Sequence, residues 1–140
     1  MNTDRPQSEA RSGGSQEIER NRWLHFLDEF TRENRGAHAR LLVIGPDAGA
    51  RVEAEDRLFE GISADVKAGE HEVSITLGSS PDDHIERGIQ SAKTIWLKPA
   101  AGEAGPTLEV AAQDGTRTVL ELTRAGDYRL SSAAGSPGRR

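Results

Sequence analysis

The first patterned part of the chain is an apolar stripe at helical spacing. Four apolar residues fall at positions i, i+3, i+4 and i+7: Trp23, Phe26, Leu27 and Phe30. The stripe predicts an amphipathic helix over residues 21–35, with Asn21 as its N-cap and Gly36 as its left-handed stop. Because the stripe holds three of the six aromatic residues of the chain, we expect it to pack against a large apolar surface.

From residue 37 onward the spacing changes to that of β-strands. Two short runs are apolar at every position, namely residues 41–44 (LLVI) and 95–97 (IWL). Such runs are typical of strands that are covered on both faces. We therefore expect one side of the sheet to lie under the helix and the other side to curl into a core.

Residues 58–77 contain two alternating segments. Their apolar positions are Leu58, Ile62, Ala64 and Val66, followed by Val73, Ile75 and Leu77. Pairing Val66 with Val73 keeps all of them on one face, whereas a slip of one residue would oppose apolar to polar side chains. Gly61, inside the first segment, is typical of a β-bulge.

The last two predicted strands flank an Asp-Gly turn at residues 114–115. A two-residue turn would place Leu108 opposite Glu121. A three-residue loop, with the glycine as a G1 bulge, places Leu108 opposite Leu120. We favour the three-residue loop because it keeps one face of the hairpin apolar.

These elements predict an α+β domain. The N-terminal helix packs on a strongly bent antiparallel meander, or partly open barrel, of about six or seven strands. Residues 1–17 and 131–140 contain too few apolar side chains to fold and are predicted to be disordered tails. Residues 18–130 then form a single domain.

Composition narrows the classes of function. The chain has a net charge of −5, and its basic residues form no cluster apart from the last two positions, so we expect no nucleic-acid partner. It has no cysteine, which excludes thiolate metal sites and thiol catalysis. No apolar run reaches the ~18 residues of a membrane span, and the N-terminus lacks the apolar core of a secretory signal. We expect a cytoplasmic protein with no membrane partner and no cofactor.

The stretch SPDDH at residues 80–84 is where two carboxylates and a histidine are adjacent. One interpretation is chemical, because Asp82, Asp83 and His84 could bind a divalent metal or act as general acid and base. Side chains that are adjacent in sequence seldom converge on one point, however, and metal ligands usually come from separate segments.

The other interpretation of this stretch is a helix cap. Ser80 is a preferred N-cap, and Pro81 suits the first helical position, where no amide is needed. Asp83 would complete a capping box with Ser80, and Gly88 would end the helix after about two turns. We favour this interpretation, which leaves His84 without an assigned role.

A polar strand face precedes this turn. Ser63, Asp65 and Lys67 recur at period two, so they share the outer face of their strand. An ordinary solvated face explains them, but together with His84 they could also form a surface for a ligand or partner. The remaining histidines have no metal-ligand spacing such as HExxH.

Three motifs together resemble a family of small bacterial proteins of unknown function. They are the helix W-x-x-F-x-x-x-F-T from Trp23, the strand G-I-S-A-D-x-K from Gly61, and the turn P-D-D-H from Pro81. The resemblance covers about residues 18–128. It implies one compact domain, and it implies no catalytic residue.

The function expected from the sequence is therefore binding. We predict a non-enzymatic binding or regulatory module that acts on a protein partner or a small ligand, with Ser63, Asp65, Lys67 and His84 as its surface. The alternative is a small metal-dependent hydrolase that uses the turn at residues 82–84. The sequence predicts no oligomeric state.

Overall fold

The computed structural model describes residues 14–66, 71–102 and 104–123. The predicted C-terminal tail and most of the predicted N-terminal tail lie outside these residues. The helical elements are η2 (Arg20–Arg22), α2 (Trp23–Asn34) and η4 (Pro81–Asp83). The strands are β1 (Gln16–Glu17), β2 (His38–Ile44), β3 (Ala50–Asp65), β4 (Glu72–Leu77), β5 (Ile85–Ile89), β6 (Ala92–Lys98), β7 (Ala104–Ala112) and β8 (Arg117–Thr123).

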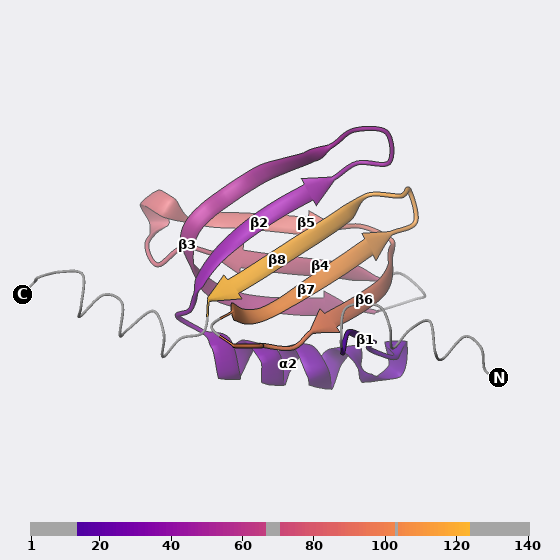
Figure 1. Ribbon diagram of the computed structural model, residues 1–140, viewed down its shortest axis with the longest axis horizontal. Coiled ribbons are helices and arrows are strands. Elements are labelled where there is room, and N and C mark those ends of the chain that lie inside the picture. Colours follow the sequence, from indigo (N-terminus) through magenta and orange to yellow (C-terminus); the bar gives the residue numbers. More distant parts are fainter. Residues whose placement is uncertain (1–13, 67–70, 103, 124–140) are drawn as a thin grey trace, which may run out of the picture.

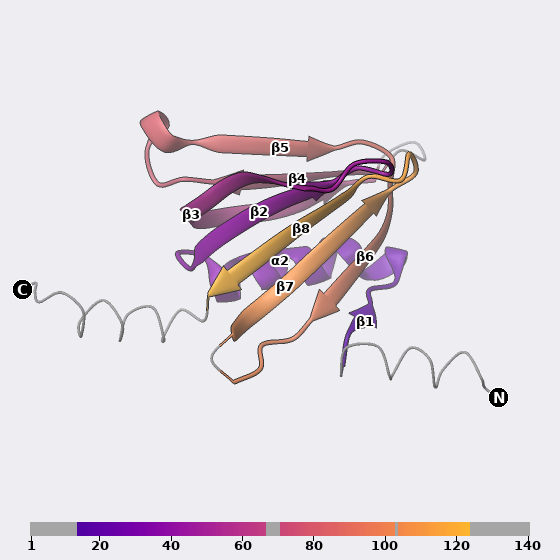
Figure 2. The same cartoon turned by 45° about the horizontal axis from the view of Figure 1, so that its top comes forward.

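The strands form one antiparallel sheet of eight strands in the order β1-β6-β7-β8-β2-β3-β4-β5. The α+β class is as predicted, but the strand number is higher, partly because the short β1 lies in the predicted N-terminal tail. The sheet is not one meander, because β2 pairs with both β3 and β8. The edges, β1 and β5, stay apart (Figure 2), so the sheet is strongly bent but not closed into a barrel.

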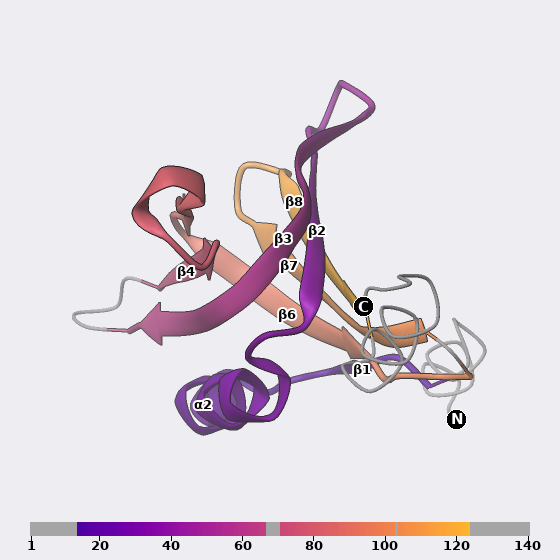
Figure 3. The same cartoon turned by 90° about the vertical axis from the view of Figure 1, so that its left-hand side faces the viewer.

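Helix α2 runs along the bottom of the bent sheet (Figure 1) and lies beneath the C-terminal end of β3 (Figure 3). Its stripe is buried as predicted at Trp23, Leu27 and Phe30, and Phe30 meets Phe59 edge to face at 5.8 Å. Trp23 Nε1 also donates a hydrogen bond of 3.0 Å to the carbonyl of Ile18. Burial of this stripe therefore joins the helix to the sheet.

The second half of β3 extends beyond β2, whose pairing with β3 ends at Leu58. The chain around the end of α2 takes the place of the missing strand. Phe59 N–H donates to Ala37 O at 2.8 Å, Gly36 N–H donates to Phe59 O at 2.9 Å, and Arg35 Nε donates to Glu60 O at 3.0 Å. Further along, Thr31 Oγ1 accepts from Ile62 N–H at 3.0 Å and donates to Ile62 O at 3.1 Å. These bonds satisfy backbone groups that would otherwise be unpaired.

The structure of β3 corrects one prediction about its pairing and confirms another. Ala64, not Val66, lies opposite Val73, so the predicted register is wrong by two residues. A shift of two residues leaves every side chain on its face, and the apolar pattern therefore could not distinguish the two registers. The bulge predicted at Gly61 is confirmed by a register shift between Phe59 and Gly61. This bulge is the reason that Phe59, rather than Leu58, is buried.

The last hairpin confirms the three-residue loop. Leu108 lies opposite Leu120, and Gly115 has a left-handed φ of +95°. The start of the helix differs from the prediction, because Asn21 lies in η2 and α2 begins at Trp23 without a side-chain cap. The predicted stop at Gly36 is confirmed by its φ of +93°.

The helix predicted after Ser80 is wrong beyond its first turn. Residues 81–83 form the 3-10 helix η4, and Gly88 lies in strand β5. Ile85 and Ile89 pair with Leu77 and Val73 of β4, and this extended pairing places both isoleucines against the core.

The prediction that strands 41–44 and 95–97 are covered on both faces is also wrong. Leu41, Val43 and Ile95 are buried, but Leu42 and Trp96, which point the other way, are only half-buried. In the part of the chain that the structure describes, no helix or strand lies over this outer face (Figure 1).

Candidate functional site

A groove of about 630 Å³ lies between α2 and the β3–β4 strands. Leu24, Leu27 and Asp28 form its helix side, and Ser63, Ser74 and Thr76 line its sheet side. The sheet side of the groove is lined by small side chains, because the cross-strand pairs are Ser63 with Ser74 and Gly61 with Thr76. Leu24 is 55% exposed at the helix side, so the groove combines an apolar wall with a floor of small hydroxyl side chains.

The groove opens where the helix stops covering the edge of β3. Ile62 turns its N–H and C=O toward Thr31, and the alternation of an antiparallel ladder turns those of Ala64 to the same side. The helix residue one turn before Thr31 is Leu27, whose side chain offers no hydrogen bond. The backbone groups of Ala64, which lines the groove, are therefore presented to it without a partner on α2.

Of the described residues predicted as a surface, Ser63 and Asp65 share one face of β3, and His84 lies apart from them. Ser63 lines the groove, and Asp65 lies two residues further along β3, where it pairs with Glu72. His84 is exposed and adjoins the other end of this ladder, where β5 begins opposite Leu77. Lys67 lies outside the described residues.

The capping box predicted at Ser80 is confirmed. Ser80 N–H donates to Asp83 Oδ1 at 3.0 Å, and Ser80 Oγ donates to the same oxygen at 3.1 Å. The backbone bond from Ser80 holds the pKa of the Asp83 carboxyl below its ordinary value. Arg57 Nη1 also donates to Asp83 O at 2.7 Å and fixes η4 to β3. Asp83 therefore has a structural role.

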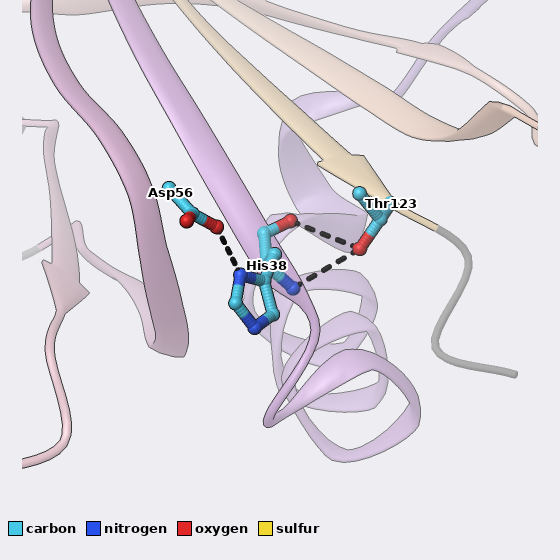
Figure 4. A network of polar contacts seen from close by, with 3 residues as sticks. All are labelled: His38, Asp56 and Thr123. Carbon is cyan, nitrogen blue, oxygen red and sulfur yellow. Dashed lines mark hydrogen bonds and ion pairs between the residues drawn. The ribbon is translucent and has the colours of Figure 1, made fainter. Parts of the chain in front are cut away.

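The sequence patterns did not predict a polar network that joins the neighbouring strands β2, β3 and β8 (Figure 4). Nδ1 of His38 on β2 contacts the carboxylate of Asp56 on β3. Thr123 Oγ1 accepts from His38 N–H at 3.1 Å and donates to His38 O at 3.3 Å. The hydroxyl is bonded to the backbone of the histidine and not to its ring, so the three residues are not arranged as a nucleophile, base and acid.

The His38 network depends on a β-bulge that no signal in the sequence predicts. Asp56 has a left-handed φ of +60°, and the β2–β3 register shifts between Ala39 and Leu41. The bulge brings Asp56 to His38, 18 residues away, beside a groove of about 660 Å³ that also includes Arg40. No periodic pattern could have predicted this pair, because the extra residue breaks the alternation.

Neither site has the composition of a metal centre. Within residues 14–66, 71–102 and 104–123, no group of three or more His, Asp or Glu side chains could hold a metal ion. Of the helices in this same part of the chain, none is long and apolar enough to span a membrane.

Comparison with known families shows to which family the chain belongs. A model of a family of unknown function, DUF5335, matches residues 14–129. The match covers most of the chain, which therefore belongs to this family, in agreement with the resemblance carried by its motifs. Searches of curated proteins and of solved structures found no match.

Proposed function

We propose that this protein is a non-enzymatic binding module that holds a short extended segment of a partner protein in the groove between α2 and β3. The observation that supports this most directly is the uncovered edge of β3 at Ala64. Its N–H and C=O can pair with one residue of an added strand, a recognition mode in which main-chain bonds supply affinity. We also infer a cytoplasmic setting.

The surroundings of Ala64 favour a peptide-like ligand. The exposed Leu24 offers apolar contact to one side chain of the segment, and Ser63, Ser74 and Thr76 offer hydroxyl groups. The volume of about 630 Å³ falls within the ~300–1,000 Å³ that is usual for ligand pockets. A small ligand that carries an amide would use the same contacts.

The hydrolase alternative at residues 82–84 has no comparable support. The carboxylate of Asp83 accepts two hydrogen bonds from Ser80, and His84 is exposed at the end of η4.

Phage-displayed random heptapeptides provide the test. Peptides selected on the wild-type protein should bind Ala64→Pro roughly 5- to 150-fold more weakly, because the peptide carbonyl loses its donor. Proline is tolerated where the N–H of a strand faces away from the ladder, so the fold should be retained, as the amide spectrum of the variant would verify. Ala64→Ser, which keeps the N–H, is the matched control. Selected peptides that bind both variants equally well would contradict the proposal.

A further inference from the structure

The outer face of the sheet carries an apolar patch, and it lies on a different side of the molecule from the proposed groove. Leu42 is the centre of the patch, because it pairs with Val52 on one side and Val119 on the other. Ile44 occupies the next outward position of β2. On the far side of Val119, Glu109 of β7 is its partner, and Trp96 of β6 is the partner of Glu109. Val52 is 45% exposed, and the other apolar members are half-buried.

A solvated sheet face is normally polar, with apolar residues only at the alternate, inward positions. The runs LLVI and IWL are instead apolar at every position. The inward residues of both runs are buried or pack against the core, whereas no described helix or strand lies over the other face of these strands, which is the right-hand face in Figure 3. The sequence thus places apolar residues on both faces of these strands, although the described part of the chain covers only one of the two faces.

The charges around the patch indicate which kind of partner could bind there. Both signs lie side by side, because Arg40 bonds Glu121 at 3.2 Å and Arg117 bonds Glu109 at 3.2 Å. Glu121 pairs with Thr107 of β7, and Thr107 pairs with Lys98 of β6, so Lys98 lies in line with Arg40 and Glu121 across the sheet. A partner of one charge sign would meet like charges somewhere on this face. A second copy, turned by a two-fold axis, can oppose each arginine to a glutamate.

The size of the face suits a weak dimer. It spans β3, β2, β8, β7 and β6, and the four spacings of ~4.8 Å between these strands make it about 19 Å wide. Seven residues along β2 make six steps of ~3.4 Å, or about 20 Å, which gives roughly 400 Å² in projection. A stable interface of standard size buries about 800 Å² on each partner, so association through this face should depend on concentration.

We propose that the outer face binds a second copy of the same chain, and that the two copies pack patch against patch as a two-fold dimer. Leu42 and Val119 lie at the centre of the interface. The paired arginines and glutamates surround them and set the register between the copies.

Sedimentation velocity of the full chain over a wide range of concentrations tests the proposal. The wild-type protein should shift from monomer to dimer, and Val52→Glu should weaken association at least about tenfold, because it places a charge against apolar side chains. Leu24→Glu is the matched control. It introduces the same charge at a side chain that is 55% exposed on α2, away from this face, and it should leave association unchanged.

A second measurement needs no variant. Amide signals of Leu42, Val52 and Val119 should shift on dilution of the wild-type protein, while those of Ser63 and Ser74 in the groove stay constant. A protein that remains monomeric at the highest concentration, or a dimer that Leu24→Glu weakens as much as Val52→Glu, would overturn the proposal. So would dilution shifts confined to other residues.

Discussion

Thr31 is the residue whose replacement tests most severely how α2 is attached to the sheet. Its side chain is buried, with 8% of the residue exposed, and its hydroxyl satisfies both the N–H and the C=O of Ile62. Thr31→Val keeps the shape and removes both bonds. Each unpaired buried backbone group costs about 1–3 kcal/mol, so the loss of both bonds should lower the free energy of unfolding by about 2–6 kcal/mol.

Thr31→Ser is the matched control for this prediction. It retains the hydroxyl and loses only the methyl group, which lies over Gly61, at an expected cost of about 1 kcal/mol. Urea denaturation followed by far-UV circular dichroism measures both variants. Equal losses in the two variants would refute the reasoning, because packing alone would then account for the contribution of Thr31.

Three further predictions concern the turn at η4 and the two tryptophans. Gly78→Ala should lower the free energy of unfolding by more than about 2 kcal/mol, because φ is +105° and a Cβ would lie 2.3 Å from a carbonyl oxygen of η4. Gly49→Ala, which meets no atom within 4 Å, should be nearly neutral when both variants are compared by urea denaturation. The pKa of Asp83 is lowered in the folded state, so its carboxylate stabilises the fold above the ordinary Asp pKa, and that stabilisation disappears as the pH falls through the lowered value. Asp83→Asn should therefore unfold at lower urea concentration than wild type near neutral pH, and the gap should close in acid; a gap that does not change with pH contradicts this. Trp23→Phe should cost about 2–3 kcal/mol, because it leaves a cavity and an unpaired carbonyl, and Trp96→Phe on the outer face should cost clearly less in urea denaturation.

Local signals in the sequence predicted the elements whose geometry is set by one or two residues. Gly115 determines the loop of the last hairpin through its left-handed backbone, and Ser80 with Asp83 forms the capping box. Both follow from short-range chemistry that a single segment contains. The α+β class followed in the same way from the spacing of apolar residues.

The candidate site depends on contacts that no local pattern encodes. Thr31 and Ile62 are 31 residues apart, and their bonds exist because β3 extends past β2 and needs a partner along that edge. The His38–Asp56 contact likewise requires a bulge. Hence Ser63 could be predicted as a surface position, whereas the open edge at Ala64 beside it could not.

Amide hydrogen exchange along β3 measures how far α2 covers the edge of this strand, which by our reasoning is only as far as Ile62. The amide of Ile62, bonded to Thr31, and that of Ser63, which the ladder turns toward β4, should exchange slowly. The amide of Ala64 should exchange much faster and become protected when a selected peptide binds. Slow exchange at Ala64 in the free protein, equal to that of its neighbours, would contradict the claim.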